Sequence, residues 1–126
     1  MNIPNGLLYT KTHEWVESIG GGKARVGLTD HAQEALGDIV FVSLPGQGDE
    51  LNVGDVFAGV ESVKAVSDVF SPVSGAVIAV NDPIADDPAR INADCYGAWL
   101  VEIQESGERE ELLDADAYRA FVSEEG

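Results

Sequence analysis

Hydrophobic residues in this chain fall mostly into short runs, and that pattern predicts β-strands rather than long helices. Within 56–61, Val56, Ala58 and Val60 are expected to share one face of a strand, because alternate side chains point the same way. Glycine, proline and small polar residues separate the runs, as they do between strands. The predicted strands cover residues 13–18, 23–28, 39–44, 56–61, 66–70, 76–80 and 98–103.

Two segments have a helical pattern instead. The first covers residues 30–36, where Asp30 is expected to cap the first turn and Gly37 follows the last one. The second covers residues 114–123, where Asp114 precedes apolar residues that recur every four positions.

The remaining stretches contain turn residues. Segment 82–94 is expected to be a loop with one helical turn after Pro88. Many short strands with helices at the margins predict a mainly β fold, a small barrel or sandwich. We expect one domain, residues 1–126, because domains usually contain ~100–150 residues.

The charge balance narrows the range of partners. The chain has 23 Asp and Glu residues against 7 Lys and Arg, a formal net charge of −16. Nucleic acids and anionic membrane surfaces are recognised by clustered basic residues, so we expect neither as a partner. We expect a soluble monomer whose partners present basic docking faces.

Targeting and cysteine patterns predict a reducing compartment. No apolar run approaches the ~18 residues of a membrane span, and the first residues lack the pattern of a signal or transit peptide. Cys95 is the single cysteine, so an intramolecular disulfide is impossible. We therefore expect a cytoplasmic protein, with a mature mitochondrial chain as the alternative.

The residue types that carry most enzyme chemistry do not form a recognisable site. His13 and His31 lie in separate predicted elements without a cysteine at metal-ligand spacing, so we expect structural or surface roles and no metal site. Cys95 is expected to be a buried thiol rather than a nucleophile. Residues 20–23 contain three glycines and a lysine but lack the flanking residues of a phosphate-binding loop. These patterns favour a binding or carrier module over an enzyme.

Lys64 stands out because the chain has only three lysines. It lies between two predicted strands, with Val63 and Ala65 beside it and the acids Glu61 and Asp68 on either side. On local chemistry alone, a solvated hairpin lysine is the ordinary interpretation. The segment also lacks the Asn-Gly or Gly chemistry of a tight turn, so propensity alone does not predict a hairpin there.

The sequence around Lys64 resembles the lipoylation site of the glycine cleavage system H proteins, a biotinyl/lipoyl-attachment-like family. The likeness covers almost the whole chain. It is carried by Glu61-Ser62-Val63-Lys64-Ala65, by Gly27-Leu28-Thr29-Asp30-His31-Ala32-Gln33-Glu34-Ala35-Leu36-Gly37, and by the segments 9–16, 38–42, 67–68, 71–75, 91–92, 96–97, 99–100 and 112–118. The sequence departs from the family pattern at Cys95, where a proline is expected, and at 97–99, where the loop is one residue short.

The resemblance implies a fold, a cofactor and a role. The implied fold is a flattened β-barrel and sandwich hybrid like a lipoyl domain, with Lys64 exposed at a hairpin tip and joined by an amide to lipoic acid. Biotin carriers place their lysine between two methionines, whereas Val63 and Ala65 flank Lys64 here. The implied role is that of a carrier, not an enzyme. It accepts an aminomethyl group from the P protein (glycine decarboxylase), presents it to the T protein (aminomethyltransferase) and is reoxidised by the L protein (dihydrolipoamide dehydrogenase).

The resemblance also implies roles for residues near Lys64. Glu14 and Asp68 match positions near the cleft that shelters the loaded arm, and we expect them to hold its amine; the alternative is a pair of ordinary surface carboxylates. Glu61 is expected to help the lipoylating enzyme identify Lys64. The expected recognition or arm-contact set is completed by Ser62, Val63, Ala65 and Gly75.

Two other interpretations stay open. An H-like protein acting chiefly as a lipoyl-relay donor to other lipoyl enzymes would use Lys64 in the same way. An unmodified structural β-domain would carry no lipoyl group, so its mass after expression with lipoate would equal that of the bare chain.

Overall fold

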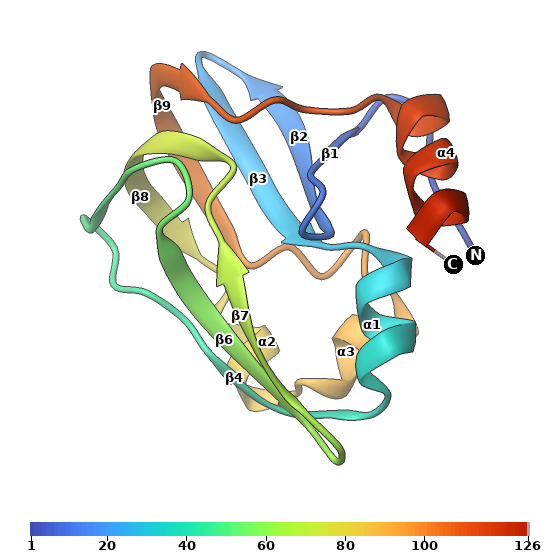
Figure 1. Ribbon diagram of the computed structural model, residues 1–126. Coiled ribbons are helices and arrows are strands. Elements are labelled where there is room, and N and C mark those ends of the chain that lie inside the picture. The colour runs from blue at the N-terminus through green and yellow to red at the C-terminus, as the bar shows by residue number, and fades with distance from the viewer. Residues whose placement is uncertain (126) are drawn as a thin grey trace.

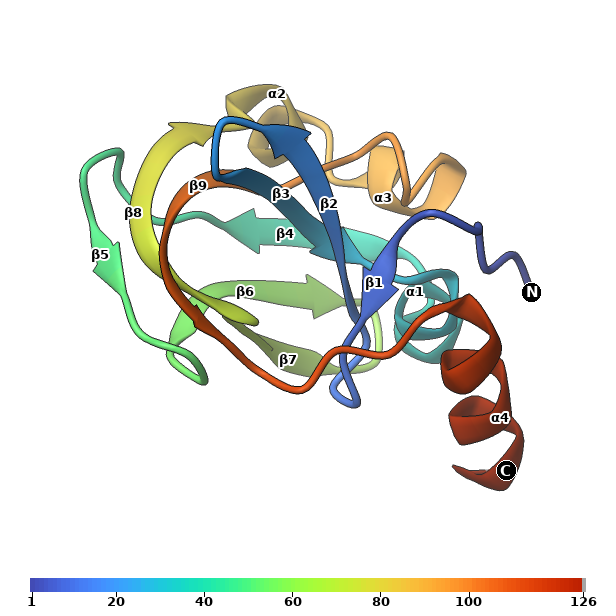
Figure 2. The same cartoon turned by 90° about the horizontal axis from the view of Figure 1, so that it is seen from above.

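The computed structural model describes residues 1–125 and contains two antiparallel β-sheets (Figure 1). The six-stranded sheet has the order β1-β2-β3-β9-β8-β5, and the three-stranded sheet has the order β4-β6-β7. The strands are β1 (Leu8–Tyr9), β2 (Glu14–Gly20), β3 (Lys23–Leu28), β4 (Ile39–Ser43), β5 (Glu50–Leu51), β6 (Val56–Ser62), β7 (Val66–Phe70), β8 (Val73–Val80) and β9 (Val101–Arg109). Figure 2 shows β8 and β9 curving around one end of the three-stranded sheet.

Both sheets contribute to one apolar core, and the predicted mainly β fold is confirmed. Val26, Val77 and Ile103 of the larger sheet belong to the same buried cluster as Val60 and Val69 of the smaller one. Burying the inner faces of two sheets against each other removes apolar surface from water, which is the main driving force for this architecture. Within residues 1–125 the sheets do not join into a closed barrel, so the arrangement is open and sandwich-like.

Strand β6 corrects one detail of the predicted pattern. Ala58 and Val60 are buried as expected, but Val56 is 53% exposed and Phe57 is buried instead. The pairing of β6 with β7 shifts register between Val56 and Ala58. An irregularity of this kind adds a residue to one strand and reverses the alternation of faces, which the sequence pattern cannot reveal.

The strands otherwise differ from the predicted ranges mainly at their ends. β3 and β7 have the predicted bounds, β4 and β6 differ by one residue at one end, and β2 begins one residue and ends two residues later than predicted. β8 begins at Val73, so the break before it is shorter than predicted. β9 begins at Val101 instead of residue 98 and continues to Arg109. β1 and β5 have two residues each, too few for a periodic pattern to be recognised.

Helix α1 (Asp30–Leu36) has the predicted range but a different cap. The Thr29 side chain accepts a hydrogen bond from the backbone N–H of Ala32 at 3.2 Å, so Thr29 and not Asp30 is the N-cap. Asp30 already has helical geometry, and its carboxylate accepts bonds from the backbone N–H of Asn2 and from the Gln33 amide, both at 2.7 Å. Two polar residues compete for the cap here, and the extended backbone at Thr29 decides between them.

The segment 82–94 contains two short helices: α2 (Asp82–Asp86), which was not predicted, and α3 (Ala89–Ala93), which is the helical turn predicted after Pro88. Each helix buries one isoleucine, Ile84 in α2 and Ile91 in α3, in the main core. Five residues are too few for a helix to be stable by itself, so tertiary burial maintains these turns.

Helix α4 (Ala115–Glu125) confirms the predicted C-terminal helix. Asp114 caps it, because its carboxylate accepts a hydrogen bond from the backbone N–H of Ala117 at 2.8 Å. Tyr118 is fully buried and stacks on Tyr9 of β1 with ring centroids 4.7 Å apart. This contact builds a second, smaller core between α4 and the edge of the larger sheet. No helix within residues 1–125 has the length and apolar character needed to cross a membrane.

Candidate functional site

Lys64 lies at the tip of the hairpin that joins β6 to β7, and in Figure 1 this tip projects below the rest of the molecule. Lys64 and its neighbours Val63 and Ala65 are all exposed. Within residues 1–125 no ion pair involves the Lys64 ammonium group. The hairpin therefore presents a primary amine whose approach is open.

Ser62 builds the turn that carries Lys64. Its backbone N–H donates to the carbonyl oxygen of Ala65 at 2.8 Å, and its hydroxyl accepts from the backbone N–H groups of Lys64 at 3.3 Å and Ala65 at 3.0 Å. The backbone N–H of Val63 donates to the carbonyl oxygen of Asp38 at 3.1 Å. A serine side chain and a backbone bond to the segment before β4 thus replace the glycine chemistry that the sequence lacks.

The Lys64 side chain lies over Gly37, the residue that ends α1. A Cβ atom at Gly37 would lie 3.4 Å from Lys64 Cε and 4.0 Å from Nζ. Gly37 also has a φ of 78°, which favours glycine at a helix C-terminus. One glycine therefore ends the helix and leaves room for the lysine stem.

A cleft of about 170 Å³ lies between α1, β7 and the turn that precedes β2. Its apolar wall comes from Ala32, Ala35 and Leu36 of α1, and Ser67 and Asp68 of β7 line it opposite. Its other lining residues are Thr12, His13, Glu14, Leu28 and His31. Since the helix rises 1.5 Å per residue, the stretch from Gly37, beneath Lys64, to His31 is about 9 Å long.

Glu14 lies in this cleft as a buried carboxylate. Its side chain accepts hydrogen bonds from the hydroxyls of Thr10 at 2.7 Å and Thr12 at 2.5 Å, and from the backbone N–H of Phe70 at 3.3 Å. Burial raises the pKa of Glu14 to about 7. The three hydrogen bonds partly offset this increase, and the negative charge of Glu110 adds to it. Near neutral pH this carboxyl is therefore partly protonated.

The predicted site residues occupy three distinct places. Asp68 is exposed on β7 and lines the same cleft as Glu14. Glu61 is exposed on β6, in register with Phe41 of β4 on one side and Val66 of β7 on the other. Gly75 lies apart from the hairpin, buried in β8 of the larger sheet, where a Cβ would come within 2.1 Å of a carbonyl oxygen of β9. The close approach of these two strands explains the glycine at that position.

The two histidines come from separate parts of the chain, but, contrary to expectation, their side chains are in contact. His13 and His31 stack with their ring centroids 4.0 Å apart, at an angle of 25° between the planes. His13 adopts a left-handed backbone conformation with a φ of 71°, which no sequence pattern indicates. Burial, followed by the neighbouring His31, lowers the pKa of His13 below its ordinary value.

Comparison with known proteins decides the family. The sequence model of the glycine cleavage H-protein family matches residues 7–125. The chain belongs to this family. It is 53% identical to a glycine cleavage system H protein of Acidobacterium capsulatum, across 99% of this chain and 98% of that protein. It is 50% identical to one from Burkholderia ambifaria, across 96% and 98% of the two chains.

A solved structure supports the same assignment. The crystal structure of a glycine cleavage system H protein from Mycobacterium marinum matches with a TM-score of 0.90 and 43% sequence identity. The match covers 96% of this chain and 99% of that one. Membership of the glycine cleavage H-protein family confirms the resemblance seen in the sequence and supports a carrier component of glycine cleavage.

The loop that departs from the glycine cleavage H-protein pattern is integrated into the core. Cys95 is buried, and its carbonyl oxygen accepts a hydrogen bond from the indole N–H of Trp15 at 3.1 Å. Burial raises the pKa of the Cys95 thiol to about 12. A thiol that stays protonated is a poor nucleophile, which agrees with the structural role predicted for it.

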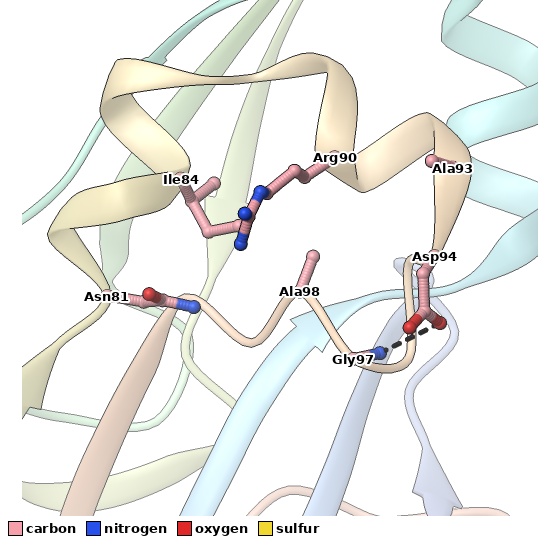
Figure 3. Close-up of a pocket in the computed structure, with 7 residues that line it drawn as sticks. All are labelled: Asn81, Ile84, Arg90, Ala93, Asp94, Gly97 and Ala98. Carbon is pink, nitrogen blue, oxygen red and sulfur yellow. Dashed lines mark hydrogen bonds between the residues drawn. The ribbon is translucent and has the colours of Figure 1, made fainter.

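A second cavity, of about 250 Å³, lies between α2, α3 and the same loop (Figure 3). The exposed Arg90 side chain extends over it and pairs with Asp87 at 3.5 Å. Asp94 accepts a hydrogen bond from the backbone N–H of Gly97 at 3.1 Å. The charged groups around this cavity are thus engaged with their own neighbours, and the cleft beside Lys64 remains the better candidate site.

Sequence reasoning included Ser62 in the expected recognition or arm-contact set, but it missed three structural features of that site, among them the role of Ser62 in building the turn. The sequence predicts that Gly37 ends a helix, but it does not indicate that the Lys64 side chain packs over this residue. Ser62 carries a usable signal, since serine hydroxyls bond backbone N–H groups two or three residues ahead. The pairing of His13 with His31 depends on how β2 and α1 pack, and local sequence holds no signal of it.

Proposed function

We propose that the chain is a lipoyl carrier of the glycine cleavage system, with lipoic acid attached as an amide to Lys64. The main support is Lys64, which is exposed at the tip of a projecting hairpin, forms no ion pair within residues 1–125, and belongs to a glycine cleavage H-protein family member. The surroundings fit the group: Gly37 makes room for the stem and an apolar-walled cleft begins beside it. The bacterial relatives support the cytoplasm as the working compartment.

The protein's contribution is attachment, orientation and shelter. Lipoic acid on Lys64 would supply a disulfide that is reduced as it takes up the aminomethyl unit from glycine decarboxylation at the P protein, and the dithiol left after transfer at the T protein would be reoxidised by the L protein. Lys64 loses its charge when the amide forms, so nothing ties the arm to the acids near the tip. The apolar α1 wall of Ala32, Ala35 and Leu36 then offers the arm a surface that excludes water.

Glu14 and Asp68 are suited to hold the cationic amine of a loaded arm. Both line the cleft, one buried and one exposed. Because the pKa of Glu14 is raised to about 7 by burial, an approaching cation would lower it and favour the ionised form. Glu14 would therefore be ionised more fully when the cationic amine of the arm lies beside it.

The face beside Lys64 is suited to recognition by the lipoylating enzyme. Phe41, Glu61 and Val66 lie abreast across β4, β6 and β7, and Phe41 and Val66 are 51% and 76% exposed. Val63 at the tip is 71% exposed. A carboxylate between apolar side chains gives an enzyme both orientation and contact area. Lipoylation of Glu61→Ala at the wild-type rate would refute the role of this carboxylate.

The deciding experiment is the intact mass of the chain after expression with lipoate and a lipoylating enzyme. We expect the mass to increase by one lipoyl group. Lys64→Arg, which keeps the charge but cannot form the amide, should retain the bare mass. Lys23→Arg is the matched control, because Lys23 is also an exposed lysine, at the start of β3, and this variant should still gain the group. A bare mass for the wild-type chain would support the unmodified β-domain instead.

Reconstitution distinguishes glycine cleavage from lipoyl relay. The lipoylated chain with P, T and L proteins should release CO2 from glycine and reduce NAD, and omission of the chain should abolish both. The chain alone should turn over no glycine. A lipoylated chain that supports no glycine cleavage but donates its lipoyl group to other lipoyl enzymes would favour the relay role.

A further inference from the structure

Three metal-ligating side chains from distant parts of the sequence meet at one end of the cleft. His13 precedes β2, His31 lies in the first turn of α1, and Glu125 ends α4. Glu125 Oε1 lies 3.0 Å from His13 Nε2 and 3.7 Å from His31 Nε2. One ligand atom from each residue lies within 4.8 Å of the other two.

The spacing of these atoms fits a first-row transition ion. Zinc binds imidazole nitrogen and carboxylate oxygen at about 2.0–2.2 Å, so neighbouring donors in a tetrahedral site lie about 3.3 Å apart. The two observed separations from Glu125 Oε1, 3.0 and 3.7 Å, lie on either side of that value. Calcium and magnesium prefer sets of oxygen ligands, so two imidazoles with one carboxylate favour the Zn²⁺ class.

The residues behind the ligands already hold His13 in position. His13 Nδ1 lies 2.7 Å from the hydroxyl of Tyr118, and that hydroxyl lies 2.9 Å from Oγ1 of Thr29. Tyr118 and Thr29 are fully buried. In one arrangement, His13 Nδ1–H donates to the Tyr118 hydroxyl, and that hydroxyl donates to Thr29 Oγ1. The Nε2 lone pair of His13 then faces Glu125. A cation between them would preserve every one of these hydrogen bonds, which is the usual support for a metal-binding histidine.

His31 turns its Nε2 nitrogen toward Glu125 as well. Its Nδ1 is buried and has no hydrogen-bond partner within residues 1–125. Buried polar atoms without a partner are rare, and each calls for an explanation. Because no neighbour among residues 1–125 fixes the tautomer of this ring, the proton can lie on Nδ1 and leave the Nε2 lone pair directed toward Glu125.

We propose that His13, His31 and Glu125 form a binding site for a divalent transition ion of the Zn²⁺ class. Three protein ligands leave a fourth position open, as in zinc sites that bind water or a small ligand. His13 and His31 also line the cleft with Glu14, so the open position faces that space. The ion would tie the end of α4 to the start of α1. This site does not depend on lipoylation of Lys64.

The test is a Zn²⁺ titration of the full chain without a polyhistidine tag, after chelator treatment and removal of the chelator. Calorimetry should show one equivalent bound, and Co²⁺ should give the visible absorption of a tetrahedral site. Glu125→Gln and His31→Gln should each weaken binding by about tenfold or more. Glu124→Gln is the matched control on the same helix, where Glu124 is outside the ligand set, and it should bind like the wild-type chain.

The variants must be folded for this comparison. Circular dichroism without metal should give each a melting temperature close to that of the wild type, because Glu125 is exposed and His31 makes few polar contacts. Zn²⁺ should then raise the melting temperature of the wild type and of Glu124→Gln but not that of Glu125→Gln. Absence of saturable binding, or equal affinity in Glu125→Gln and wild type, would overturn the proposal.

Discussion

Glu14 is an ionisable side chain that is only 1% exposed. Two hydroxyls and a backbone N–H satisfy its oxygens, so its hydrogen bonding is complete while its charge is poorly solvated. This combination makes the protonated form the more stable one below neutrality. Ionisation of Glu14 near pH 7 therefore affects the stability of the folded state.

The stability of the chain should therefore fall as pH rises through this titration. Glu14 has a pKa of about 7 in the folded chain against a reference value of 4.5, so the folded state binds more protons between these values. Because the folded state loses this proton only at the higher pH, the free energy of unfolding should fall by roughly 3 kcal/mol as pH rises from about 4.5 to about 7. Above about pH 7 this carboxyl causes no further loss.

Urea denaturation of wild type and Glu14→Gln in metal-free buffer at several pH values checks this expectation. The glutamine amide also alters the contact with the Phe70 N–H, which changes stability at every pH. The quantity to compare is therefore how the free energy of unfolding of each protein changes with pH. The variant should lack the loss between about pH 4.5 and 7. Parallel curves for the two proteins would contradict the raised pKa.

The roles proposed for Glu14 and Asp68 give a second prediction at this scale. Glu14→Ala and Asp68→Ala should each speed hydrolysis of the loaded arm, because the cationic amine loses a carboxylate partner. The release of formaldehyde and ammonia from the loaded, isolated chain measures this rate. Asp55→Ala, an exposed acid outside the cleft, is the control. Unchanged release in both cleft variants would leave these residues as ordinary carboxylates.

The β6–β7 hairpin shows how one side chain shapes an element. The Ser62 hydroxyl accepts hydrogen bonds from two N–H groups at the tip, those of Lys64 and Ala65. Ser62→Ala should raise the amide exchange rates of Lys64 and Ala65 and slow lipoylation, with a loss of global stability of only about 1 kcal/mol.

Hydrogen exchange followed by NMR measures the first effect, and the rate of lipoyl incorporation measures the second. Ser67→Ala on β7 is the control, because its hydroxyl bonds a carbonyl oxygen of its own strand and no N–H at the tip. Exchange rates at Lys64 and Ala65 that match those of the wild type would show that the turn does not need the Ser62 hydroxyl.

The elements that the sequence predicted are those with a strong local signal. Short runs bounded by turn residues predicted β3 and β7 to the residue, and a cap with four-residue recurrence predicted α4. Helix α3 is the helical turn predicted after Pro88, whereas α2 was missed because the burial of Ile84, not local propensity, maintains it.

The site divides in the same way. Lys64 was identifiable because its segment matches a family motif, and the turn that presents it required the structure. The contact between His13 and His31 arises from packing between segments 18 positions apart, which local patterns do not encode. Glu125 joins them from the far end of the chain for the same reason.

At the scale of the whole molecule, charge is the dominant surface property. The formal net charge is −16, and loss of the Lys64 charge on lipoylation would make it −17. A carrier that meets several enzymes benefits from long-range attraction that speeds encounter without tight binding. The acidic surface supports partners with basic docking faces.

Encounter rates with those partners should therefore depend on salt. We expect the association rate of the lipoylated chain with P, T or L protein to fall as ionic strength rises from about 0.01 to 0.15 M, since the screening length shrinks from about 30 to 8 Å. Stopped-flow fluorescence at several NaCl concentrations measures it, with the uncharged free lipoamide as control. Equal salt slopes for chain and control would exclude electrostatic steering.

The hydrogen bond from Val63 to Asp38 has a consequence for the order of events in the cell. Asp38 lies 25 positions before Val63, so this contact exists only after α1 and β4 have taken their places. An enzyme that recognises the shape of the tip would pass over newly synthesised and misfolded chains. Lipoylation would then act as a quality check, and the modified pool would contain only molecules that had completed folding.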